Sequence, residues 1–142
     1  MKKITSKLLL RIAAIGMLFH TIGHAVGSSA WQNPNGKVPP DVINKMQNIH
    51  FAIQGKDTTM AMSFSGMSYI ASVFLLWVTF TLWISSNRTD KEAVRILLLT
   101  GLAIALLVVI EFLFFFPGVA FLSLAIFLMT FISIFKITKA MK

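Results

Sequence analysis

Four long apolar segments constrain the fold of this chain more than any other feature. They run over residues 8–28, 58–85, 93–116 and 119–135. Three are long enough to cross a hydrocarbon core of about 30 Å, and the fourth is at the short limit of roughly 17 residues. Because the bilayer interior has no water to satisfy backbone amides, each segment must be helical. The sequence therefore predicts an all-α fold, an integral membrane four-helix bundle forming a single transmembrane domain over residues 1–142.

The composition excludes several classes of protein. Hydrophobic residues make up 56% of the chain, charged residues 13%, and the mean hydropathy is +0.79, which is typical of a membrane protein. The chain has no cysteine, so disulfides, thiolate nucleophiles and cysteine-ligated metals are excluded. The net charge of +8 arises from basic residues that flank the apolar segments rather than form a patch. We therefore expect no nucleic-acid partner; the bilayer itself is the expected surrounding.

The basic residues also predict an orientation. Of the 13 lysines and arginines, ten lie before or in the opening turn of the first span, between the second and third spans or in the opening turn of the third, or after the fourth. Lys37, Lys45 and Lys56 alone occupy the long first loop. The positive-inside rule then places both termini in the cytoplasm, an N-in/C-in arrangement. For a bacterial chain this describes a multi-pass protein of the inner membrane.

The first span has a competing interpretation. Three lysines, an apolar run and the small residues Ser28, Ser29 and Ala30 resemble a secretory signal peptide with its cleavage site. Arg11 interrupts that run, and two histidines dilute its end. We favour a retained helix, and cleavage stays open.

The first loop also carries a helical pattern, over about residues 40–54. Pro39 and Pro40 suit a helix start, and Gly55 suits its end. Val42, Met46, Ile49 and Ile53 recur on one face, with His50 at the edge of that face. This predicts a short amphipathic helix in the first extracytoplasmic loop, lying on the membrane surface or capping the bundle.

Titratable residues inside the spans mark a candidate site. His20 and His24 lie one helical turn apart in the first span, and Glu111 is the acidic residue deep in the third. All three fall in the predicted outer half of the bilayer, together with Ser65 and Tyr69 of the second span. Ionisable groups at that depth indicate a functional site, because hydrocarbon penalises them.

Glycines share the histidine face of the first span. Gly16, Gly23 and Gly27 lie near His20 around the helix, and such small residues let a second helix approach closely. The histidines are therefore expected to point into the bundle, where the leading prediction is binding of a small ligand or metal at His20, His24 and Glu111.

Three ligand chemistries stay open at this site. His20, His24, Glu111 and His50 could hold a divalent metal, since histidines at i and i+4 with a carboxylate form a tripod. A bis-histidine haem would need His50 opposite His20 or His24, and ranks below the metal. A His–Glu pair could also exchange a proton or bind the polar head group of a quinone, lipid or isoprenoid as an acid–base enzyme.

A purely structural role is the alternative. The same side chains could hydrogen-bond to one another and to Ser or Tyr of the second span, fixing helix register. The glycine face and the loop helix would then dock a membrane-protein partner or a second copy of the chain. Catalytic residues are not assigned by the sequence.

The segment LFHTIGH, a tryptophan soon after it and an outer loop with a short helix resemble small four-helix bacterial inner-membrane proteins with an F-H-x-x-G-H first helix. In layout the chain is more distantly similar to DoxX-like proteins. That resemblance implies an accessory role beside a redox or quinone-linked partner in the membrane.

Overall fold

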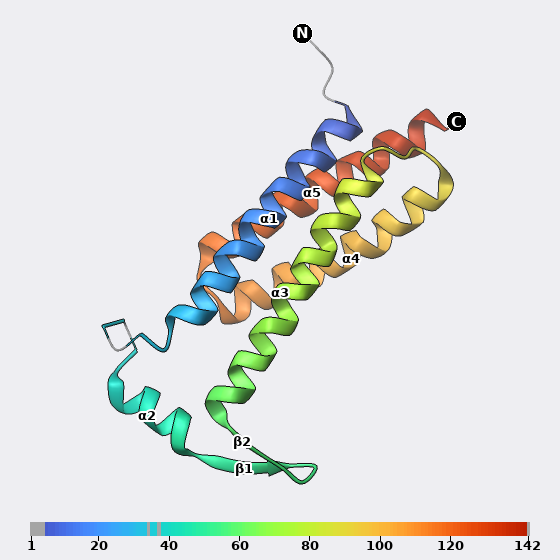
Figure 1. Ribbon diagram of the computed structural model, residues 1–142. Coiled ribbons are helices and arrows are strands. Elements are labelled where there is room, and N and C mark those ends of the chain that lie inside the picture. Colours follow the sequence, from blue (N-terminus) through green and yellow to red (C-terminus); the bar gives the residue numbers. More distant parts are fainter. Residues whose placement is uncertain (1–4, 34, 37, 142) are drawn as a thin grey trace. The chain divides into compact units, whose positions relative to one another are not determined.

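The computed structural model describes residues 5–33, 35–36 and 38–141 (Figure 1). Within them, four helices are long and apolar enough to cross a membrane. They are α1 (Ser6–Ala30), α3 (Met60–Ser85), α4 (Lys91–Phe114) and α5 (Pro117–Ala140). The predicted four-helix membrane architecture is confirmed at this level. Four basic residues used for the orientation lie outside the described residues: Lys2, Lys3, Lys37 and Lys142.

The predicted helix over residues 40–54 is too long. Helix α2 covers Pro40–Asn48, and an antiparallel hairpin of β1 (His50–Ile53) and β2 (Lys56–Thr59) follows it. Gln54 and Gly55 connect the strands with φ angles of 50° and 80°, the left-handed pair that a two-residue hairpin turn requires. Ile49 and Ile53 fit a helical repeat, but with Phe51 between them they fit a strand repeat equally well. His50, which the sequence placed at the edge of the helical face, is instead the first residue of β1.

The connection between α4 and α5 also differs from the expectation. The predicted spans left Pro117 and Gly118 between the third and the fourth, whereas α5 begins at Pro117 itself, after a break at Phe115 and Phe116. Proline suits the first helical position because its missing N–H has no partner there anyway. The fourth span is consequently 24 residues long and no longer at the short limit.

The described chain divides into two compact units. Unit 1 contains residues up to His20 and from Leu75 onward, and unit 2 contains Thr21–Phe74. The core of unit 1 joins α1, α3, α4 and α5 through apolar side chains, among them Leu10, Met17, Leu82, Leu97, Ile104 and Ile126. In Figure 1, α4 and α5 run side by side as a hairpin in this unit.

Unit 1 has the side-chain distribution of a membrane protein. Large apolar residues such as Leu99, Leu113 and Phe135 are about 70% exposed, while Glu111 and Ser123 are buried. A surface this apolar matches lipid, and polar side chains gather where helices meet. The buried polar residues of α4 and α5 are therefore candidates for a functional site.

The turn before α4 contains a hydrogen-bonded ion pair. The Asp90 side chain accepts a hydrogen bond from the Ala93 amide and caps the helix, and Arg88 binds the same carboxylate. The amide hydrogen bond, followed by that from Arg88, holds the pKa of Asp90 below its usual value. The hydrogen bond and charge of Asp90 in turn raise the pKa of Arg88. This turn begins α4 cleanly after the end of α3.

Candidate functional site

The central contact joins the predicted residues His20 and Glu111. His20 Nε2 lies 3.1 Å from Glu111 Oε1, and the two side chains are 7% and 3% exposed. His20 lies on α1 and Glu111 in the last turn of α4. Two of the residues that the sequence singled out are therefore brought together within unit 1, in direct hydrogen-bond contact.

Ser123 on α5 completes a three-residue relay. Its hydroxyl lies 3.2 Å from His20 Nδ1, and Ser123 is fully buried. Other buried hydroxyls in unit 1, such as those of Thr79 and Thr130, bond to a carbonyl of their own helix four residues back. That is the ordinary way for Ser and Thr to be satisfied in a helix. Ser123 instead reaches across to α1.

This relay can gain or lose one proton without losing a hydrogen bond. If Glu111 is ionised and His20 neutral, Nε2–H donates to Oε1 and the Ser123 hydroxyl donates to Nδ1. If one proton is added to Glu111 at Oε2, Nε2–H still donates to Oε1; if it is added at Nδ1 instead, the imidazolium donates to Glu111 on one side and to Ser123 on the other. The serine hydroxyl permits this change because it both donates and accepts. The geometry is that of a buried acid–base pair with an adjustable third member.

The surroundings disfavour an isolated negative charge on Glu111. Glu111 lies in the last turn of α4, where the helix dipole is negative. Val108 precedes it by nearly one turn and belongs to the apolar core. The contact with His20, through its hydrogen bond or its charge, therefore stabilises the buried carboxylate. Glu111 Oε2 is buried and has no hydrogen-bond partner among the described residues.

A close approach of α1 and α5 positions His20. A Cβ built on Gly16, one turn before His20, would lie 3.4 Å from the Ile126 side chain. The small residue lets α5 come near enough for Ser123 to reach Nδ1. The sequence expected such packing at Gly23 and Gly27, but within unit 2 a Cβ at either would meet no atom within 4 Å. Gly16 alone of the three fulfils that expectation.

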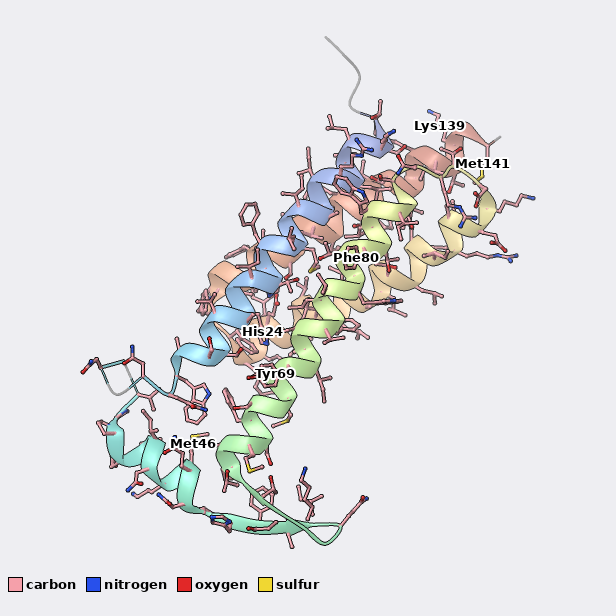
Figure 2. All side chains as sticks on the ribbon, in the orientation of Figure 1. His24, Met46, Tyr69, Phe80, Lys139 and Met141 are labelled. Atoms are coloured by element: carbon pink, nitrogen blue, oxygen red, sulfur yellow. The ribbon has the colours of Figure 1, made fainter. Side chains whose placement is uncertain are left out.

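His24 follows His20 on α1 but belongs to unit 2. Its Nε2 is buried and has no hydrogen-bond partner among the described residues. Figure 2 shows His24 on α1 and Tyr69 on α3. The predicted joint ligation by His20, His24 and Glu111 thus has one geometric contact in its support, that of His20 with Glu111.

His50 has a different partner. Its Nδ1 lies 2.9 Å from Asp57 Oδ2, across the hairpin of β1 and β2, and both side chains are largely exposed. Among the described residues, no group of three or more His, Asp or Glu side chains lies close enough to hold a metal ion. His20 and Glu111 could supply two ligands to a metal, and the rest of its coordination would have to come from elsewhere.

The predicted residues Ser65 and Tyr69 line a polar recess in unit 2. Ser68 of α3 also lines it, and the remaining residues come from the end of α1 and the turn after it; the full lining is Ser28, Ser29, Gln32, Ser65, Ser68 and Tyr69. The Trp31 ring packs edge-on against Phe64, with ring centroids 5.4 Å apart, and so ties the end of α1 to α3. No sequence pattern indicated that Ser28, Ser29 and Gln32 belong to such a site.

Ser123 was also missed, although the sequence holds a signal for it. Along α5, the buried polar residues Ser123, Thr130 and Ser133 lie on one face with Ile126 and Ile137. Hydroxyls that recur on one face of an apolar span mark the side that meets other helices. The sequence assigned the hydroxyl partner of the His–Glu pair to the second span, but the fourth supplies it.

No family model, no curated protein and no solved structure matches this chain.

Proposed function

We propose that this chain is a multi-pass membrane protein whose His20–Glu111–Ser123 site exchanges a proton with the polar head group of a small membrane-soluble ligand. One observation carries the proposal: the buried carboxylate of Glu111 has one oxygen on His20, and its other oxygen, Oε2, has no partner in the part of the chain that the structure describes. A buried polar atom left unpaired is costly, so a ligand hydroxyl or carbonyl that reaches Oε2 gains a ready hydrogen bond. A quinol or another hydroxylated amphiphile has that chemistry.

The proton would move between the ligand oxygen and the relay. A ligand hydroxyl that donates to Oε2 passes its proton to the carboxylate, and His20 with Ser123 redistributes the resulting hydrogen bonds. Such a pair performs acid–base chemistry when burial separates its protonation states. An accessory role beside a membrane redox system fits this activity, because quinone chemistry couples electrons to protons.

Infrared spectroscopy tests the proton site directly. A pH titration of the protein in nanodiscs should show a carboxylic-acid carbonyl band that appears and disappears, and Glu111→Gln should abolish it. The matched control is Glu92→Gln, an exposed acid in the first turn of the same helix. If the band survives in Glu111→Gln, or if no buried carboxylic acid titrates, the proposal is wrong.

A metal or haem is the competing occupant. Elemental analysis and a visible spectrum of untagged protein in mild detergent distinguish it from a proton site. A stoichiometric metal or a Soret band, lost in His20→Ala and His24→Ala, would overturn the proton proposal. A colourless, metal-free protein would agree with it.

We also propose the N-in/C-in orientation in a bacterial inner membrane, with α2 on the outer surface. The charge distribution supports it, and Leu10, Ala13, Ala14 and Met17 support a retained first span because they belong to the core of unit 1. The absence of native cysteine makes single-cysteine labelling clean. A membrane-impermeant maleimide applied to intact spheroplasts should label Lys56→Cys and spare Thr89→Cys. The reverse pattern would invert the topology.

A further inference from the structure

The polar recess of unit 2 is a second candidate binding site, separate from the proton site of unit 1. Its six lining residues are all polar and uncharged, although more than half of the chain is hydrophobic. All six belong to unit 2, whereas His20, Glu111 and Ser123 belong to unit 1. The recess therefore belongs to a different set of side chains from the relay.

The hydrogen-bonding capacity of the recess is largely unused. Ser28 and Ser29 donate their hydroxyl protons to the carbonyls of Ala25 and Val26, so their oxygens are left to accept. The side chains of Ser65, Tyr69 and Gln32 make no hydrogen bond among the described residues. The recess therefore offers both hydrogen-bond donors and hydrogen-bond acceptors to a ligand.

Two further polar atoms belong to residues close to Ser28 in the sequence. His24 Nε2, one turn before Ser28, and Trp31 Nε1, three residues after it, are buried without a partner among the described residues. Buried polar atoms are nearly always paired in native proteins. Their state points to a polar ligand or ordered water at this end of α1.

The chemistry of the lining selects an uncharged, hydroxyl-rich group. A phosphate or carboxylate would call for Arg or Lys, and a cation would call for Asp or Glu; none lines the recess. Ser and Tyr hydroxyls and a Gln amide match sugar or glycerol hydroxyls, which donate and accept in the same way.

The position of the recess favours a lipid as the source of that group. Ser28 and Ser29 lie in the last turn of α1, so the recess is at the end of a membrane-crossing helix. Val26, Met67 and Ile70 nearby in sequence are more than 60% exposed and suit acyl chains. We propose that this recess binds the uncharged, hydroxyl-rich head group of a glycolipid.

Native mass spectrometry of the full chain tests this inference. The probe is monoglucosyl diacylglycerol, compared with diacylglycerol of the same acyl chains. We expect the glucosyl lipid to bind preferentially, and each hydrogen bond lost from the recess to weaken it about fivefold. Tyr69→Phe and the double variant Ser65→Ala/Tyr69→Phe remove recess hydroxyls; Ser63→Ala, on the same helix but outside the lining, should leave binding unchanged.

Several outcomes decide the question. Equal binding of both lipids, or equal binding by Tyr69→Phe and the native chain, would overturn the proposal; Tyr69 is 68% exposed, so this variant is expected to fold. Displacement of the glucosyl lipid by phosphatidic acid would overturn it too, because the head group would then be a phosphate. Methyl glucoside that competes as well as the lipid would support the hydroxyl chemistry and assign it to a soluble sugar. Retained binding in Glu111→Gln separates this result from that of the proton site.

Discussion

Two histidine–carboxylate pairs in this chain have nearly the same geometry and opposite surroundings. His20 Nε2 lies 3.1 Å from Glu111 Oε1, with both side chains under 10% exposed. His50 Nδ1 lies 2.9 Å from Asp57 Oδ2, with exposures of 58% and 73%. At such distances water reduces the attraction of two charges to about 1 kcal/mol, whereas a protein interior keeps several times more. The distance alone therefore does not show which pair interacts more strongly.

The two pairs also differ in how the chain holds them. Helices α1, α4 and α5 each contribute one member of the buried relay, so its geometry depends on how these three helices pack. The exposed pair bridges the two four-residue strands of a hairpin. The buried pair is fixed by tertiary packing, and the exposed pair by local backbone alone, so only the first can impose a precise protonation chemistry.

The largest expected effect comes from His20→Ala. It leaves the Glu111 carboxylate buried without its partner, which should lower the free energy of unfolding by about 3 kcal/mol. Denaturant unfolding in detergent measures this loss. The double variant His20→Ala/Glu111→Gln should recover part of it, because no buried charge is then left unpaired. A loss in His20→Ala no larger than that in His50→Ala would erase the distinction between the two pairs.

Gly16→Leu should have the next largest effect. The added side chain would collide with Ile126, and overpacking of this kind costs about 2 kcal/mol. Gly16→Ala is the matched control, since its Cβ at 3.4 Å only reaches contact distance. The titrating band of Glu111 should also shift in Gly16→Leu, because Ser123 is drawn away from His20. An unchanged band would show that the close approach does not position the relay.

Ser123→Ala should cost less, about 1 kcal/mol, in line with other hydrogen bonds between membrane helices. It removes the hydroxyl at His20 Nδ1 and leaves Glu111 in place. Thr130→Val is the control on the same helix, because the Thr130 hydroxyl bonds only to its own helix at Ile126. Nitrogen NMR of His20 should report a changed tautomer balance in Ser123→Ala and none in Thr130→Val. Identical spectra would remove Ser123 from the relay.

The sequence predicted the four spans because hydropathy over about 20 residues is a strong, local signal. It also predicted the contact between His20 and Glu111, since buried ionisable groups at similar depth have few other partners. The hairpin at residues 50–59 was missed because Ile49 and Ile53 satisfy two periods at once, and the left-handed pair Gln54–Gly55 decides between them.

What the sequence could not supply is which helices meet. Ser123 and Ser65 have the same chemistry, yet Ser123 reaches His20 and Ser65 lines the polar recess. Both lie in apolar spans and both suit a helix interface. The role of Ser123 follows from the packing of Gly16 against Ile126, a contact between residues 110 positions apart that no local pattern encodes.

Asp57→Asn should have the smallest effect on the free energy of unfolding. Its response to salt tests the difference between the two histidine–carboxylate pairs most directly. An exposed ion pair contributes less than about 1 kcal/mol, and at about 1 M salt charges are screened within about 3 Å. The small loss of stability in Asp57→Asn should therefore vanish in 1 M NaCl, while the loss in His20→Ala should persist, because salt does not enter the bundle. Denaturant unfolding of both variants at low and high salt measures this contrast. If salt abolishes both effects, water reaches His20, and the relay is an open pair like that of His50. If salt abolishes neither, the Asp57 side chain acts through its hydrogen bond to His50 rather than through its charge, and salt does not distinguish the two pairs.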